Sequence, residues 1–176
     1  MRKALILVVL ALAAVPAALA DDSPSPTTAP EQRASALCKQ QRLAMGSAFT
    51  LLYGGARNAY GRCVSKVAGT VSGEQADAAK LCKAERDDAG FAAAHAGKTF
   101  AELYGTGKHG NNAFGRCVSS KAKTLEQKEQ QATISAAKTC KAEHTTLGPA
   151  DFKKKYGGRS NAFGKCVSKT AKTLSP

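Results

Sequence analysis

The chain is organised around one stretch, Asn161-Ala162-Phe163-Gly164-Lys165-Cys166-Val167-Ser168, which occurs in near-copy at 58–65 and at 112–119. Asparagine can cap a following helix by accepting hydrogen bonds from its first free amides. Phe163, Cys166 and Val167 are spaced so that they share one helical face. Each copy of this stretch, called the capping motif below, therefore predicts a helix that turns this face inward.

Two further motifs precede each copy in fixed order. One is a Cys-Lys pair within a segment rich in Ala, Lys and Glu, which predicts a longer helix at 31–45, 74–89 and 125–144, closed by a glycine at 46, 90 and 148. The other is Phe-x-x-x-Tyr-Gly, ending at Gly54, Gly105 and Gly157. Phe and Tyr four residues apart lie on one helical face, and the glycine supplies a left-handed stop.

The predicted fold is therefore all-α, with three tandem short helical units at 31–69, 74–122 and 125–172. The middle unit carries extra residues around 92–97 and 106–110, which loops can absorb. A glycine recurs in the first turn of each capping-motif helix, at Gly61, Gly115 and Gly164. We expect another backbone to pack closely there, and the alternative is an anionic ligand approaching the bare backbone.

The six cysteines allow 15 pairings in principle. If the units fold alike, each is stapled by one internal disulfide, which would contribute about 3 to 4 kcal/mol by closing a loop of this length. Such staples suit units with few aromatic residues and no Trp. No C-x-x-C or other metal-ligand cluster is present, so we predict no metal, no cofactor and no thiol redox activity. The predicted pairs are Cys38 with Cys63, Cys82 with Cys117, and Cys140 with Cys166.

The N-terminus predicts export. A basic head, an apolar run and a small-x-small site before Asp21 are typical of a cleaved signal peptide at 1–20, and an uncleaved anchor is the rival interpretation. Residues 21–30 are rich in Pro, Ser and Thr and predict a disordered linker. Cleavage would change the formal net charge from +13 to +11, because Arg2 and Lys3 are lost. We therefore expect a secreted, extracellular protein with a strongly basic surface.

The third unit is the most basic, with nine basic and two acidic residues between Lys138 and Lys172. A cationic surface attracts polyanions of many kinds, such as a wall polymer, a nucleic acid or an acidic glycan. A solubilising face without a partner is the alternative. The candidate polyanion-binding residues are Lys153, Lys154, Lys155, Arg159, Lys165, Lys169 and Lys172.

The three motifs together resemble bacterial secreted repeat proteins that carry the Asn-Ala-Phe-Gly-Lys-Cys-Val-Ser pattern, a group without an assigned activity. The resemblance covers residues 31–169 and implies export and repetition. With no catalytic constellation in the sequence, we predict a non-enzymatic binding or structural module of the cell envelope or extracellular space. The alternative is a membrane-active, antimicrobial-like cationic protein, which needs an exposed apolar face opposite its lysines.

Overall fold

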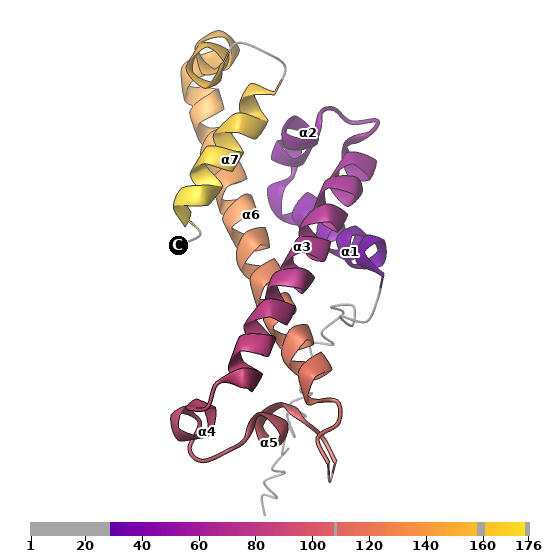
Figure 1. Cartoon of the computed structure of the whole chain (residues 1–176). Helices are drawn as coiled ribbons and strands as arrows, with labels where there is room; N and C mark the ends of the chain where they lie inside the picture. Colours follow the sequence, from indigo (N-terminus) through magenta and orange to yellow (C-terminus); the bar gives the residue numbers. More distant parts are fainter. Residues whose placement is uncertain (1–28, 108, 158–160, 175–176) are drawn as a thin grey trace, which may run out of the picture.

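The computed structural model describes residues 29–107, 109–157 and 161–174, and this part of the chain contains helices and no strand. The predicted signal peptide, most of the predicted linker and Arg159 lie outside it. The prediction of an all-α fold is confirmed (Figure 1). The helices are α1 (Pro30–Met45), α2 (Ser47–Tyr53), α3 (Ala59–Asp87), α4 (Phe91–Ala94), α5 (Phe100–Tyr104), α6 (Ala113–Tyr156) and α7 (Ala162–Leu174).

The three disulfides join the cysteines that the repeat predicts. Cys38 bonds to Cys63, Cys82 to Cys117 and Cys140 to Cys166, and all six cysteines are fully buried. The bridges do not close separate units, however. Helix α3 carries the second cysteine of one pair and the first of the next, and α6 does the same. The disulfides therefore link α1 to α3, α3 to α6, and α6 to α7 into one continuous array.

The two long helices arise because nothing stops them between the copies of the pattern. Residues 68–73 and 120–125 contain no proline, and both segments are helical. Gly69 and Gly73 are exposed to solvent and lie in the middle of α3. At such positions a glycine costs up to about 1 kcal/mol but does not end a helix. The predicted unit boundaries after residues 69 and 122 thus fall inside α3 and α6.

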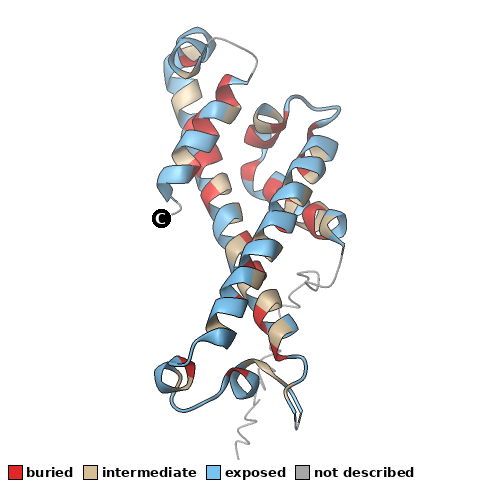
Figure 2. Cartoon of the chain, viewed as in Figure 1, coloured by how far each residue is buried: buried red, intermediate tan, exposed pale blue. Residues whose placement is uncertain are grey.

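Two apolar clusters lie at opposite ends of the crossing pair α3 and α6 (Figures 1 and 2). The larger cluster combines the first and third copies of the pattern, with Phe49 of α2 and Phe152 of α6 almost fully buried. The smaller cluster belongs to the middle copy and contains Phe91, Phe100 and the Cys82–Cys117 bridge. The copies are thus unequal: two share a core and the third has its own.

Helix ends follow the predicted glycines in part. Gly54 and Gly157 are left-handed with φ of 83° and 97°, as expected. Gly148, with φ of 74°, breaks the helical path of α6 just before Pro149. The prediction is wrong at Gly105, which is extended with φ of −79°; the lack of a side chain matters there for space instead, because a Cβ would clash with the carbonyl oxygen of Ala101. Helix α3 also ends at Asp87, ahead of the predicted stop at Gly90.

Two predictions for the capping motif are also wrong. The side chains of Asn58 and Asn112 make no cap hydrogen bond. Asn112 instead uses Oδ1 to accept a hydrogen bond from the backbone N–H of Thr106, at 3.0 Å, which closes the loop after α5. The recurrent glycines are not in close packing either. A Cβ added at Gly61, Gly115 or Gly164 would meet no atom within 4 Å.

Candidate anion-binding surface

The inner side of each copy is fixed by a tyrosine that bonds to the residue three positions after the first cysteine. Tyr53 Oη donates to Gln41 Oε1 at 2.7 Å. Tyr104 donates to Glu85 at 2.9 Å and Tyr156 to Glu143 at 2.8 Å. Because an amide serves as well as a carboxylate in this place, the contact is structural and needs no acid.

The next position holds a side chain over the aromatic ring of the capping motif. Arg42 lies 5.9 Å from the ring centre of Tyr60, and Arg86 lies 5.3 Å from that of Phe114. In the third copy His144 takes this place, 6.5 Å from Phe163. His144 is half-buried rather than fully solvated. The same holds for His95, which stacks on Phe91 at 4.0 Å.

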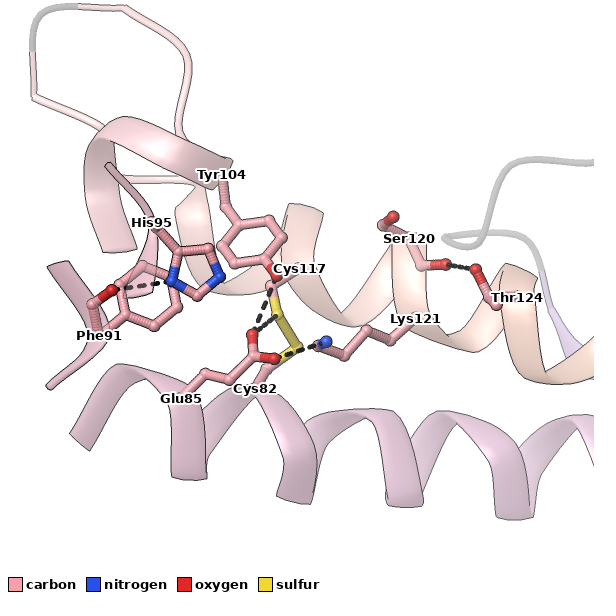
Figure 3. A network of polar contacts seen from close by, with 9 residues as sticks. All are labelled: Cys82, Glu85, Phe91, His95, Tyr104, Cys117, Ser120, Lys121 and Thr124. Carbon is pink, nitrogen blue, oxygen red and sulfur yellow. Dashed lines mark hydrogen bonds and ion pairs between the residues drawn. A yellow bond between two sulfur atoms is a disulfide. The ribbon is translucent and has the colours of Figure 1, made fainter. Parts of the chain in front are cut away.

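Glu85 in the middle copy shows how a lysine near the tyrosine contact is neutralised by an ion pair (Figure 3). Its Oε1 pairs with Lys121 Nζ at 2.7 Å, and its Oε2 accepts from Tyr104. Burial alone would raise the pKa of Glu85, but the hydrogen bonds from Lys121 and Tyr104 bring this pKa below its ordinary value. In the third copy, hydrogen bonds from Lys155 and Tyr156 likewise lower the pKa of Glu143.

The outer side of the capping motif forms a basic hollow in the first and third copies. The hollow at the start of α3 has a volume of about 690 Å³, and the one along α7 about 670 Å³. Five equivalent motif positions line both hollows: the asparagine, the glycine, the basic residue before cysteine, the serine and the lysine after it. The residues at these positions are Asn58, Gly61, Arg62, Ser65 and Lys66 at the start of α3, and Asn161, Gly164, Lys165, Ser168 and Lys169 at the start of α7.

The two hollows adjoin, because Lys66 lines both. No Asp or Glu lines either hollow. The side-chain ammonium groups of Lys66, Lys169 and Lys172 have no hydrogen-bond or ion-pair partner among the described residues, so they are available to a ligand. We call this surface the basic face; its cations are Arg57, Arg62, Lys66, Lys165, Lys169 and Lys172.

Two of these cations also have a structural role at a helix end. The guanidinium of Arg62 lies against Gly54, the left-handed residue that ends α2. Lys165 does the same at the end of α6, where a Cβ on Gly157 would lie 2.7 Å from its Nζ. A cation at a helix C-terminus is favourable because the last carbonyls carry partial negative charge. Arg62 and Lys165 therefore contribute both to the fold and to the basic face.

The structure separates the residues that the sequence proposed for polyanion binding. Lys165, Lys169 and Lys172 lie together on the basic face. Lys153 and Lys154 are exposed at the end of α6 but line neither hollow. Lys155 pairs with Glu143 at 2.5 Å. The sequence reasoning missed Arg57, Arg62 and Lys66, although the last two occupy the same motif positions as Lys165 and Lys169.

The middle copy lacks the free lysine and the free asparagine that line the two hollows. Ser120 stands where the other copies have Lys66 and Lys169, and the neighbouring Lys121 is paired with Glu85. Its asparagine, Asn112, is bonded to Thr106 through both side-chain atoms, at 2.7 and 3.0 Å. The basic face is thus built from the first and third copies, the same two that share a core.

Comparison of the chain with protein-family models, with curated proteins and with solved structures finds no match. Among residues 29–107, 109–157 and 161–174, no helix is long and apolar enough to cross a membrane. The same residues contain no group of three or more His, Cys, Asp or Glu placed to hold a metal ion. Fold and surface thus define an all-α, disulfide-linked, cationic protein with a basic face over α3 and α7.

Proposed function

We propose that the protein is an exported module that binds linear polyanions through its basic face. The observation that carries this proposal is the adjoining pair of hollows, which gathers six cations and no carboxylate. Such a surface neutralises several phosphate, sulfate or carboxylate groups at once and gains affinity from counterion release. The three buried disulfides suit an oxidising compartment.

The glycines of the basic face support the same proposal. Gly61 and Gly164 line the two hollows, and no neighbouring atom prevents a Cβ at either position. Packing therefore does not require glycine there, and a glycine in a helix costs up to about 1 kcal/mol relative to alanine. The presence of glycine at these two positions is explained if an anionic group approaches the backbone there, beside Ser65 or Ser168.

The membrane-active alternative has less support. Helix α7, the most basic candidate, uses its apolar residues Phe163, Cys166 and Val167 in the core. The large apolar side chains that are exposed are distributed one to a helix, so none of the described helices presents an apolar face opposite its lysines. They are Leu43 of α1, Leu51 of α2, Leu81 of α3, Leu103 of α5, Leu147 of α6 and Leu174 of α7.

The test compares two triple variants with equal loss of charge. Changing Lys66, Lys169 and Lys172 to Gln removes cations from the basic face. We expect binding to heparin and to single-stranded DNA to weaken, with the slope of log K against log salt reduced by about one for each lysine lost. The matched control changes three exposed lysines on α1, α3 and α6 outside the hollows, namely Lys39, Lys83 and Lys128.

The control variant should keep most of the affinity of the parent protein at each salt concentration. Equal losses in both variants would mean that binding follows net charge alone and would overturn the assignment to the basic face. Leakage of dye from anionic vesicles by the parent protein, without retention on heparin, would favour the membrane-active alternative instead.

A further inference from the structure

A cavity of about 420 Å³ lies between α1, α2, α3, α6 and α7, beneath the basic face. It shares Leu52, Lys66, Ser168 and Lys172 with the hollow along α7, so it opens towards that hollow. Its volume is within the range of cavities that hold small organic molecules. No part of the polyanion proposal uses the residues deeper in this cavity.

The deep lining has two chemical characters. Aliphatic side chains from α1, α3 and α7 form one part, including Leu37, Val71 and Val167. The other part is acidic, with Glu74 from α3 and Glu126 and Glu129 from α6. In a chain of formal charge +13, three carboxylates around one cavity are an unexpected concentration of negative charge.

Arg33, whose charge acts on Glu74, does not neutralise the three carboxylates. Arg33 of α1 contacts Glu126, and both side chains are at least nine-tenths buried. Nη1 of Arg33 has no hydrogen-bond partner among the described residues. Neither Glu74 nor Glu129 has an ion-pair partner among the described residues, and the charges that act on Glu74 are those of Glu126, Glu129 and Arg33. With Glu74 ionised, three carboxylates face the guanidinium of Arg33, while Lys66 and Lys172 line the part of the cavity that it shares with the basic face.

The protonation of Glu74 reflects this surplus. Burial, followed by the charges of Glu126 and Glu129, raises its pKa to about 8, while Arg33 acts in the opposite direction. Burial and the charge of Glu129 likewise raise the pKa of Tyr53 to about 12, so its phenol stays neutral and donates to Gln41. A positive group beside Glu74 would favour the carboxylate and expel its proton.

We propose that this cavity is a binding site for a small organic cation with an apolar body, whose positive group lies among Glu74, Glu126 and Glu129. The aliphatic side chains receive the apolar body. A bare metal ion fits poorly, because the lining offers no histidine and the described residues contain no metal-ligating group of three. An anionic amphiphile fits poorly as well, since its charge would have to stay at Lys66 and Lys172.

Calorimetry with benzamidine and benzamide tests the proposal, because the two probes have nearly the same shape and differ in charge. We expect benzamidine to bind at least tenfold more tightly than benzamide at pH 8.5, where Glu74 is mostly ionised although burial raises its pKa to about 8. Only the ionised Glu74 pairs with the cation. The affinity for benzamidine should therefore fall by about tenfold or more between pH 8 and pH 6, as Glu74 becomes protonated, and level off above pH 8. The other titratable or charged groups that face Glu74 or line the cavity are Arg33 on α1, Tyr53 on α2, Lys66 on α3, Glu126 and Glu129 on α6, and Lys172 on α7.

Glu74→Gln keeps the shape of the side chain and removes its charge. We expect this variant to lose about tenfold or more in affinity for benzamidine and to lose the pH dependence between pH 6 and 8. The matched control is Asp77→Asn, on the same helix but outside the cavity. Equal binding of the two probes, an unchanged pH profile in Glu74→Gln, or no binding of benzamidine at millimolar concentration would each overturn the proposal.

Discussion

Arg33 and Glu126 form a charged pair in the interior of a small, disulfide-linked protein. Their side chains are 2% and 7% exposed, so both charges have lost most of their hydration. Burial raises the pKa of Glu126, and the adjacent guanidinium opposes this shift. A buried pair of this kind is rarely a large net gain in stability, but each partner makes the other tolerable.

Removing one partner should therefore cost more than removing both. We expect Arg33→Met to lower the free energy of unfolding by about 3 to 5 kcal/mol at pH 7, because it leaves the Glu126 carboxylate buried without its cation. The double variant Arg33→Met with Glu126→Leu should recover most of this loss. Urea unfolding of both variants and of Glu126→Leu alone gives the interaction energy. Additive effects would show that the pair is not coupled.

Sequence could not reveal this pair, and the reason is physical. The reasoning from repetition finds only residues that recur at equivalent places, such as the cysteines or the Tyr and Phe of the short helices. Arg33 lies five residues before its cysteine and Glu126 fourteen before its own, so neither has a counterpart that repetition could expose. Repetition could not reveal the neighbouring cavity either. Its lining comes from five helices and forms only where copies of the pattern pack together.

At the scale of helices, the recurrent spacing predicted much of the structure. It indicated the short helices before Gly54 and Gly157 and the three disulfide pairings. It did not indicate that the last helix of one copy continues into the first helix of the next. No strong helix stop is present at 68–73 or 120–125. Because the flanking residues have high helix propensity, the two helices on either side of each segment join into one long helix.

The disulfide of the middle copy should matter most for local order, because its apolar cluster is small. We expect Cys82→Ala with Cys117→Ala to destabilise the end that carries α4 and α5 by roughly 3 to 4 kcal/mol, the contribution expected for a bridge with a separation of 35 residues. Limited proteolysis with mass spectrometry should then show cleavage between Asp88 and Gly105.

The comparison variant is Cys140→Ala with Cys166→Ala, whose bridge lies in the larger cluster with Phe152 and Phe163. In that variant the segment between Asp88 and Gly105 should resist protease as it does in the parent protein. Cleavage of this segment to the same extent in both variants would mean that the two clusters do not unfold separately.

For the whole molecule, the decisive feature is that the first and third copies pack together while the middle copy stands apart. The sequence suggested three equal units, and only the extra residues in the middle copy indicated a difference. Those residues include His95, whose ring stacks on Phe91. Phe91 in turn contacts Phe100 in the smaller apolar cluster, which belongs to the middle copy. Contact between the first and third copies then brings Lys66 beside Lys169 and creates the basic face.

Hydrogen exchange in the native state should reveal this division. Amides near Cys140 and Phe152, in the larger cluster, should be the most protected, and those near Phe91 should exchange through a less costly local opening.

Saturating heparin should then slow exchange in the first turns of α3 and in α7, and leave α4 and α5 unchanged, because the basic face includes Lys66 and Lys169 but no cation of the middle copy. Mass spectrometry of peptides from both ends measures this directly. Equal slowing at both ends would contradict an anion site confined to the first and third copies.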